Sequence, residues 1–253
     1  MSDEQQNGVK QKPKHSGHLL SVKQIQQKVF VPVEGLSAEM RECLGEIEDS
    51  FTCIVWGWSA NGKTSMVGKL LKELSHVGHI LYLSYEEGHG KTVQDMVNRN
   101  ELDDVPLQFL DHATFEELCI RLNKKQSPKI IIVDSLQYAR FTYEQYKELK
   151  RQFVFGKVAK RRKIFIFISH ANGKHPKGSA AVDIRYDANI KIWVEGFLAD
   201  IESRYGSKKN YVIWEQRAKL YWGKKFNKMV YKLGKPKTPV VQDESKSITE
   251  EAK

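Results

Sequence analysis

Short apolar runs alternate along the chain with stretches in which apolar residues recur every three or four positions. The runs rich in β-branched and aromatic residues predict strands at 51–56, 79–84, 130–133, 164–169, 190–194 and 211–214. The three- to four-residue spacing predicts helices at 63–76, 114–122 and about 142–162, the second of which opens with a Thr114–Glu117 capping box. Strands that alternate with helices imply right-handed crossovers and a mostly parallel sheet, so we expect an α/β fold.

Polar sequence without apolar periodicity flanks this region. It predicts disordered tails at 1–18 and 234–253, and a single domain at 19–233, where neither an internal repeat nor a Gly/Ser linker occurs. The longest apolar runs hold about five residues, whereas a membrane helix needs about 18 or more. The N-terminus has no apolar signal segment, and the cysteines (Cys43, Cys53 and Cys119) are odd in number and far apart. We expect a cytoplasmic protein with reduced thiols and no membrane partner.

Charge is distributed unevenly within the formal net charge of +10. Residues 36–139 carry 10 Lys and Arg against 16 Asp and Glu, whereas residues 140–177 carry 11 against 2 and residues 203–237 carry 11 against 1. Basic blocks of this kind are typical of proteins that bind a polyanion, and they also occur where lysine only maintains solubility. DNA is the expected partner of this C-terminal half, with contributions from Lys160–Lys163 and Asn172–Lys177.

One motif carries specific chemistry. The segment Gly57–Thr64 reads G-W-S-A-N-G-K-T, matches the phosphate-loop pattern G-x-x-x-x-G-K-[ST], and lies between a predicted strand and a predicted helix, as that motif requires. Backbone amides at a helix N-terminus point toward a β-phosphate, Lys63 reaches the β/γ oxygens, and the Thr64 hydroxyl is a ligand for Mg²⁺. ATP and Mg²⁺ are the expected cofactors. Nucleotide contacts are expected from Gly57, Trp58, Ser59, Ala60, Asn61, Gly62, Lys63, Thr64 and Ser65.

Acidic and polar residues follow three of the other predicted strands. Asp134 ends a buried strand at the sheet edge where ligands bind, and is the expected second Mg²⁺ ligand. Some ATPase classes place a catalytic Glu at the next position, but Ser135 stands there. Glu86 is therefore the candidate for the residue that activates water, with Glu87 in reserve, and His170 is the candidate sensor of the γ-phosphate. The alternatives are solvated acids at a loop entrance and a histidine with local hydrogen bonds.

In this order, these residues resemble the RecA-like P-loop ATPase superfamily, in particular the group of RadA, KaiC and the ATPase cores of hexameric replicative helicases. The similarity covers about residues 36–215 and rests on Gly57–Thr64, Tyr82–Glu87, Ile131–Gln137 and Ile168–His170. It implies a three-layer αβα sandwich with a mostly parallel central sheet and C-terminal antiparallel strands. It also implies ATP hydrolysis with Glu86 as the catalytic glutamate and His170 as the sensor, and a mobile DNA-facing loop at Ala171–Tyr186.

The resemblance extends to a basic finger that enters the neighbouring subunit's ATP site. Ser203–Gly206 is similar to that finger, although Ile201 replaces its lysine. Arg204 would therefore act in trans in a homo-oligomeric ring or filament.

The function expected is that of a DNA-stimulated ATPase: a helicase, a loader, or a recombination or replication accessory factor with a protein partner in those processes. Tyr211, Trp214, Tyr221 and Trp222 lie among lysines and arginines, where they are suited to stack on single-stranded DNA. A small-molecule or nucleotide kinase and a non-hydrolysing nucleotide-dependent loader or switch remain as alternatives.

Overall fold

The computed structural model describes residues 19–156 and 158–231, so the predicted tails at 1–18 and 234–253 lie outside the described residues. Contacts divide the chain into two units between Val31 and Pro32. In its described part, the first unit contains helix α1 (Val22–Gln26), which begins with a capping box formed by Ser21 and Gln24. The elements described below belong to the second unit.

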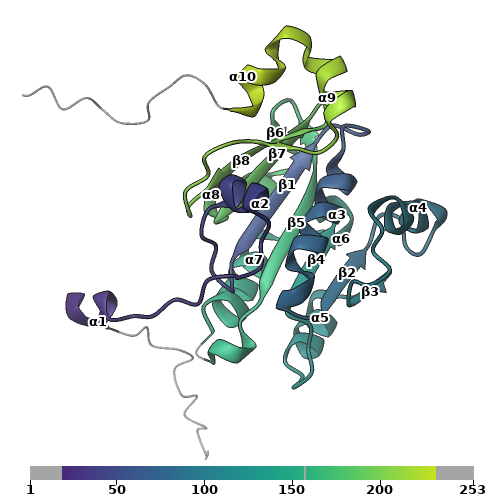
Figure 1. The fold of residues 1–253 in the computed structure, drawn as a ribbon. Coiled ribbons are helices and arrows are strands. Elements are labelled where there is room, and N and C mark those ends of the chain that lie inside the picture. The colour runs from purple at the N-terminus through teal and green to yellow at the C-terminus, as the bar shows by residue number, and fades with distance from the viewer. Residues whose placement is uncertain (1–18, 157, 232–253) are drawn as a thin grey trace, which may run out of the picture. The chain divides into compact units, whose positions relative to one another are not determined.

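A nine-stranded sheet forms the centre of this unit (Figure 1). Its strands are β1 (Thr52–Gly57), β2 (Ile80–Ser84), β3 (Leu107–Leu110), β4 (Ile130–Asp134), β5 (Ile164–Asn172), β6 (His175–Pro176), β7 (Ile190–Glu195), β8 (Leu198–Ser203) and β9 (Tyr211–Val212). The order across the sheet is β3–β2–β4–β5–β1–β7–β8–β9, and β6 pairs with β5. The strands from β3 to β7 in this order are parallel, whereas β6, β8 and β9 are antiparallel to their partners. The predicted α/β class, mostly parallel sheet and antiparallel C-terminal strands are confirmed.

Helices pack on both faces of the sheet. One apolar cluster joins one face to α2 (Ala38–Leu44), α3 (Lys63–Leu74) and α4 (Lys91–Asn100). A second cluster joins the other face to α5 (Phe115–Leu122), α6 (Leu136–Ala139), α7 (Tyr143–Leu149) and α8 (Ser179–Asp187). The helices α9 (Glu215–Trp222) and α10 (Phe226–Val230) follow β9. This arrangement is compatible with the predicted three-layer sandwich.

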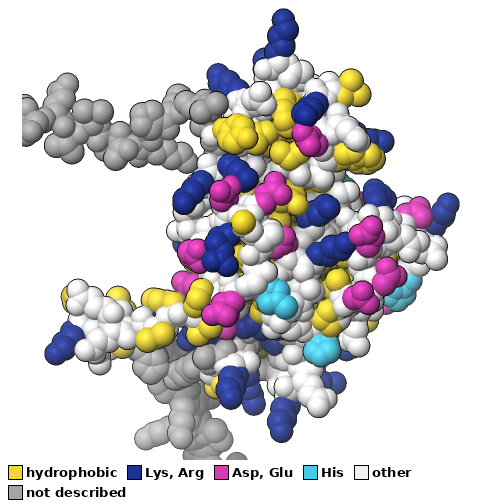
Figure 2. Space-filling view, in the orientation of Figure 1, with side chains coloured by type: hydrophobic (Ala, Val, Ile, Leu, Met, Phe, Trp, Pro, Cys, Tyr) yellow, Lys and Arg dark blue, Asp and Glu magenta, His cyan; other side chains and the backbone are white. Residues whose placement is uncertain are grey.

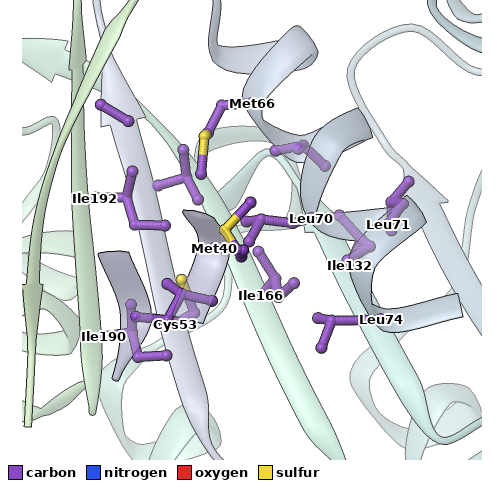
Figure 3. Close-up of a cluster of buried hydrophobic side chains, with 14 of the residues drawn as sticks. Met40, Cys53, Met66, Leu70, Leu71, Leu74, Ile132, Ile166, Ile190 and Ile192 are labelled. Atoms are coloured by element: carbon purple, nitrogen blue, oxygen red, sulfur yellow. The ribbon is translucent and has the colours of Figure 1, made fainter. Parts of the chain in front are cut away.

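The two-residue period of the strands divides their side chains between these clusters. In β5, Ile164, Ile166 and Ile168 belong to the cluster with α3, whereas Phe165 and Phe167 belong to the other cluster. Figure 3 shows side chains of α2 and α3 lying over the sheet: Met40, Met66 and Leu70 lie close to Cys53, Ile166 and Ile192. Because central strands are buried on both faces, their sequences read as continuous apolar runs.

Two predicted segments have a different structure. The helix expected at about 142–162 is interrupted: α7 ends at Leu149, a π-helical segment (Lys150–Val154) follows, and a short 3-10 turn (Ala159–Arg161) precedes β5. The segment Ala171–Tyr186, expected to be a loop, instead has regular structure: β5 continues to Asn172, pairs with β6, and is followed by α8. The expected contact of this segment with DNA stays a prediction. Burial of Ala181 and Ile184 against the sheet accounts for the helix there.

Candidate functional site

The predicted phosphate loop joins the end of β1 to the start of α3. At Gly57, an added Cβ would stand 2.2 Å from the Val194 carbonyl oxygen of β7, so a larger residue does not fit. Gly62 precedes α3 with φ of +104°, in the left-handed region that favours glycine. The two glycines of the motif thus allow the loop to turn tightly beside β7 and to deliver Lys63 at the first position of α3.

Asn61 fixes this loop to the turn between β7 and β8. Its Oδ1 accepts a hydrogen bond from the Gly196 amide at 2.8 Å, and its carbonyl oxygen accepts one from the Phe197 amide at 3.1 Å. Its side-chain amide donates to the Ser59 carbonyl oxygen at 2.9 Å. The side chain of Asn61 thus holds the loop in place. Its expected contact with a nucleotide stays a prediction.

The Lys63 ammonium lies near two acidic side chains: Asp134, which ends β4, and Glu86, which follows β2. Its Nζ donates a hydrogen bond to the Trp58 carbonyl oxygen at 2.9 Å. Burial lowers the pKa of Lys63, while the charges of Asp134 and Glu86 act in the opposite direction. Because an ammonium has three donor protons, this one bond leaves protons for an anionic ligand.

Asp134 is held at the carboxyl end of β4 by a tyrosine from the neighbouring strand. The Tyr82 hydroxyl of β2 donates a hydrogen bond to Asp134 Oδ2. Burial raises the pKa of Asp134 to about 6, and the charges of Glu86 and Glu87 add to the rise, whereas the Tyr82 hydrogen bond and the Lys63 charge oppose it. A carboxylate in such an environment is stabilised by a cation.

The donor set beside Asp134 suits Mg²⁺. The Thr64 hydroxyl group belongs to a residue that lines the same cleft as Asp134. Among the described residues, no three or more His, Cys, Asp or Glu side chains form a metal site made by the protein alone. One carboxylate and one hydroxyl are a fitting protein contribution for Mg²⁺, which commonly keeps several waters and takes its other ligands from phosphate.

Glu86 and His170 form a pair. Glu86 Oε2 and His170 Nε2 are 2.8 Å apart, and both side chains are partly exposed. Strand register explains how residues 84 positions apart meet: His170 pairs with Gly57 at the end of β1, and Ser84 pairs with Asp134 at the end of β4. The carboxyl ends of β2, β4, β5 and β1 therefore bring the predicted site residues to one edge of the sheet.

Gln137 of α6 connects this pair to the β5–β6 hairpin. Its Oε1 accepts a hydrogen bond from the His170 amide at 3.0 Å. Its Nε2 donates to Ser169 Oγ at 3.0 Å and to the Lys177 carbonyl oxygen at 2.7 Å. Gln137 ends the Ile131–Gln137 motif, but the sequence alone indicates no role for its side chain.

A cleft of about 500 Å³ brings most of the predicted residues together. The predicted residues that line it are Ser59, Ala60, Gly62, Lys63, Thr64, Ser65, Glu86, Asp134 and His170, together with the reserve candidate Glu87. Gly57, Trp58 and Asn61 belong to the loop but do not line the cleft.

Part of this lining was not predicted from the sequence. The residues without a predicted role there are Tyr82, Val93, Met96, Arg99, Ser135, Ile168, Phe197, Trp214 and Arg217. The Arg217 guanidinium lies 4.5 Å from the Trp214 ring centroid and 5.1 Å from that of Phe197. The cleft therefore has an aromatic wall as well as a charged end. Of Phe197, Trp214 and Arg217 in this wall, only Trp214 carried a sequence signal, as an aromatic residue among basic ones.

Arg204 lies elsewhere. It follows Ser203, which pairs with Ile190 at the start of β7, so it lies at the edge of the sheet opposite the phosphate loop. Its guanidinium donates to the Asp187 carbonyl oxygen at 3.1 Å. The structure does not bring Arg204 to the cleft of its own chain.

The predicted basic cluster Lys160–Lys163 is less accessible than its sequence indicated. Lys163 is 3% exposed, and its ammonium donates to Ser127 Oγ and to the Pro128 carbonyl oxygen, each at 2.7 Å. Burial lowers the pKa of Lys163 to about 8. Lys160 and Arg161 are exposed, at the amino end of β5 and thus away from the cleft.

Basic side chains also occur at the carboxyl edge of the sheet, near the cleft. Lys174 and Lys177 are exposed in and after the β5–β6 hairpin. Figure 2 shows Lys and Arg side chains spread over the drawn face, some of them beside apolar side chains at the end formed by α9 and α10. The lysines of the C-terminal block beyond Tyr231 lie outside the described residues.

No helix in the described part of the chain has the length and apolar character needed to cross a membrane. Comparison of the chain with protein-family models gave no match, and neither did a search of curated proteins. The functional conclusion therefore depends on the side chains that meet at the carboxyl edge of the sheet.

Proposed function

We propose that this protein binds and hydrolyses ATP as a RecA-like P-loop ATPase. The observation that carries the proposal is the convergence of Lys63, Thr64, Asp134 and the Glu86–His170 pair on one cleft. A glycine loop that opens a helix is a ready site for phosphate. The aromatic wall formed by Phe197, Trp214 and Arg217 gives the cleft a second end that suits a nucleobase.

Each charged side chain has a role in this reaction. Lys63 binds the β/γ-phosphate oxygens, and Thr64 and Asp134 hold Mg²⁺, which offsets phosphate charge when bound. Glu86 accepts the proton of the attacking water. The water oxygen then forms a bond to the γ-phosphorus while the bond to the β–γ bridging oxygen breaks, which gives ADP and phosphate.

His170 links this chemistry to the rest of the protein. Its imidazole is bonded to Glu86, and its amide is bonded to Gln137, which also holds the Lys177 carbonyl oxygen. A change in the charge near Glu86 on hydrolysis would alter the His170 contact first. The β5–β6 hairpin is the next element along this chain of hydrogen bonds.

We further propose that DNA, in single-stranded form, is the partner that stimulates turnover. The exposed Lys174 and Lys177 near His170 and the basic helices after β9 support this proposal. Arg204 remains a proposed trans-acting residue of a homo-oligomer in the cytoplasm, since it does not reach the cleft of its own chain.

The test is steady-state ATP turnover in the Glu86→Gln variant, with Glu87→Gln as the matched control. Glu86→Gln is expected to retain ATP binding and to lose turnover by about 10²–10⁴-fold, because the amide cannot accept the proton. Glu87→Gln should keep most of the activity, since Glu87 has no contact with His170 comparable to that of Glu86.

Lys63→Ala should lose turnover in the same assay, because it removes the cation that binds phosphate at the loop. Normal turnover in a folded Lys63→Ala protein would contradict the proposed function. Loss of activity in Glu87→Gln with full activity in Glu86→Gln would instead move the base to Glu87.

A further inference from the structure

Ser135 carries a buried hydroxyl without a hydrogen bond. The residue is 0% exposed, and its Oγ has no partner among residues 19–156 and 158–231. A buried polar atom without a partner destabilises a folded protein and is uncommon. The stability of the folded protein therefore does not explain why residue 135 carries a hydroxyl group.

The position of Ser135 at the start of a helix strengthens this observation. Ser37, Thr114 and Thr142 occupy the N-cap of α2, α5 and α7, and each hydroxyl accepts a hydrogen bond from the amide three residues later. Ser135 is the N-cap of α6 with a similarly extended backbone, yet its side chain makes no capping bond. The capping hydrogen bond that favours serine at an N-cap is thus absent at α6.

The surroundings of Ser135 include the side chains that are proposed to bind phosphate. Ser135 lines the same cleft as Lys63, Glu86 and His170. It directly follows Asp134, and β5 separates β4 from β1 and the phosphate loop. A phosphate chain that begins at the loop and extends toward Asp134 and Glu86 brings its terminal group to this part of the cleft.

We propose that the Ser135 hydroxyl donates a hydrogen bond to the terminal phosphate group of bound ATP, as a further catalytic residue. This inference rests on the proposed function. Negative charge is spread over the non-bridging γ-oxygens in the transition state, and a fixed donor there stabilises it. Ser135 forms and breaks no covalent bond, because Glu86 takes the proton of the water and the ADP oxygen takes the electron pair of the broken bond.

The experiment compares the thermal unfolding and turnover of Ser135→Ala with those of the wild-type protein. Unfolding is measured without nucleotide, with Mg²⁺ and ADP, and with Mg²⁺ and a non-hydrolysable ATP analogue. Without nucleotide, Ser135→Ala should unfold at the wild-type temperature or above it, because a buried atom without a partner has been removed. ADP should raise its unfolding temperature as in the wild type, whereas the ATP analogue should raise it less, and kcat should fall by about 10²-fold.

Thr142→Ala is the matched control, since it removes a hydroxyl that does cap its helix. It should lower the unfolding temperature of the nucleotide-free protein and leave kcat and both nucleotide shifts unchanged. A Ser135→Ala variant that behaves like Thr142→Ala would show that the hydroxyl serves folding, which overturns the inference.

Two other outcomes separate this inference from the proposed function. Wild-type kcat and a wild-type analogue shift in Ser135→Ala overturn the role of Ser135 and leave the ATPase proposal intact. If the wild-type protein itself shows no nucleotide shift and no turnover, the proposed function fails and the role of Ser135 fails with it.

Discussion

Replacing Asp134 by Asn is expected to stabilise the metal-free protein at neutral pH and to abolish Mg²⁺-dependent turnover. The Asp134 carboxylate lies at the carboxyl end of β4, near the charges of Glu86 and Glu87. An amide of the same shape removes this charge, and its oxygen still accepts the hydrogen bond from the Tyr82 hydroxyl. The same substitution removes the negative charge of the proposed Mg²⁺ ligand.

The pKa of Asp134 sets the size and the pH range of the effect. Burial raises this pKa from an ordinary value of 3.8 to about 6. At 1.36 kcal/mol for each pH unit, the difference corresponds to about 3 kcal/mol. Between pH 4 and 6 the carboxyl group is ionised in the unfolded chain and protonated in the folded one, so the free energy of unfolding falls as pH rises through this interval. Asp134→Asn should therefore be more stable than the wild type by up to about 3 kcal/mol above pH 6, and equally stable near pH 4.

The assay is urea unfolding at pH 4.5 and 7.5 with a chelator present. Asp187→Asn provides a control of opposite sign: burial acts to raise the pKa of Asp187, but hydrogen bonds from Lys150 and Tyr146 outweigh it and lower that pKa. This variant should lose stability at pH 7.5. An Asp134→Asn protein that is less stable than the wild type at pH 7.5, or a difference that does not change with pH, would refute the reasoning.

Two further predictions concern the partners. Replacing Lys174 and Lys177 by Gln should lower DNA-stimulated turnover more than basal turnover. It should also flatten the salt dependence of DNA binding, because fewer counterions are released. Unchanged stimulation by DNA together with an unchanged salt titration of DNA binding would exclude the hairpin as the binding surface. Arg204→Ala and Glu86→Gln subunits should each be inactive alone and regain partial activity when mixed, because some sites then combine an intact Glu86 with a neighbour's intact Arg204. No recovery in demonstrably mixed oligomers would remove the trans role of Arg204.

The local sequence was sufficient to predict the strand–loop–helix unit around Lys63 and the buried strand that ends at Asp134. Both depend on apolar periodicity and on glycine, which act over a few neighbouring residues. It was not sufficient for β3, a four-residue edge strand without a fully buried side chain, or for α8, whose helical face contains small residues.

Contacts within the site depend on the register of the sheet. The Tyr82–Asp134 and Glu86–His170 hydrogen bonds join residues 52 and 84 positions apart, and no local pattern specifies such pairs. In the sequence, position 135 stands out only because it lacks the catalytic Glu that some ATPase classes have there. The failure of its hydroxyl to cap α6 is visible only in three dimensions.

The position of β5 between β1 and β4 has a consequence for the evolution of this fold. A one-residue insertion in β5 would turn Phe165 and Phe167 to the opposite face and shift His170 relative to Gly57 and Asp134 at once. A substitution tolerated between Phe165 and Phe167 must suit both β1 and β4, whereas β3 has only β2 beside it in the described part of the sheet. Among homologous sequences, the length of β5 should vary least and the length of β3 most, and changes in β5 should be accompanied by changes in both β1 and β4.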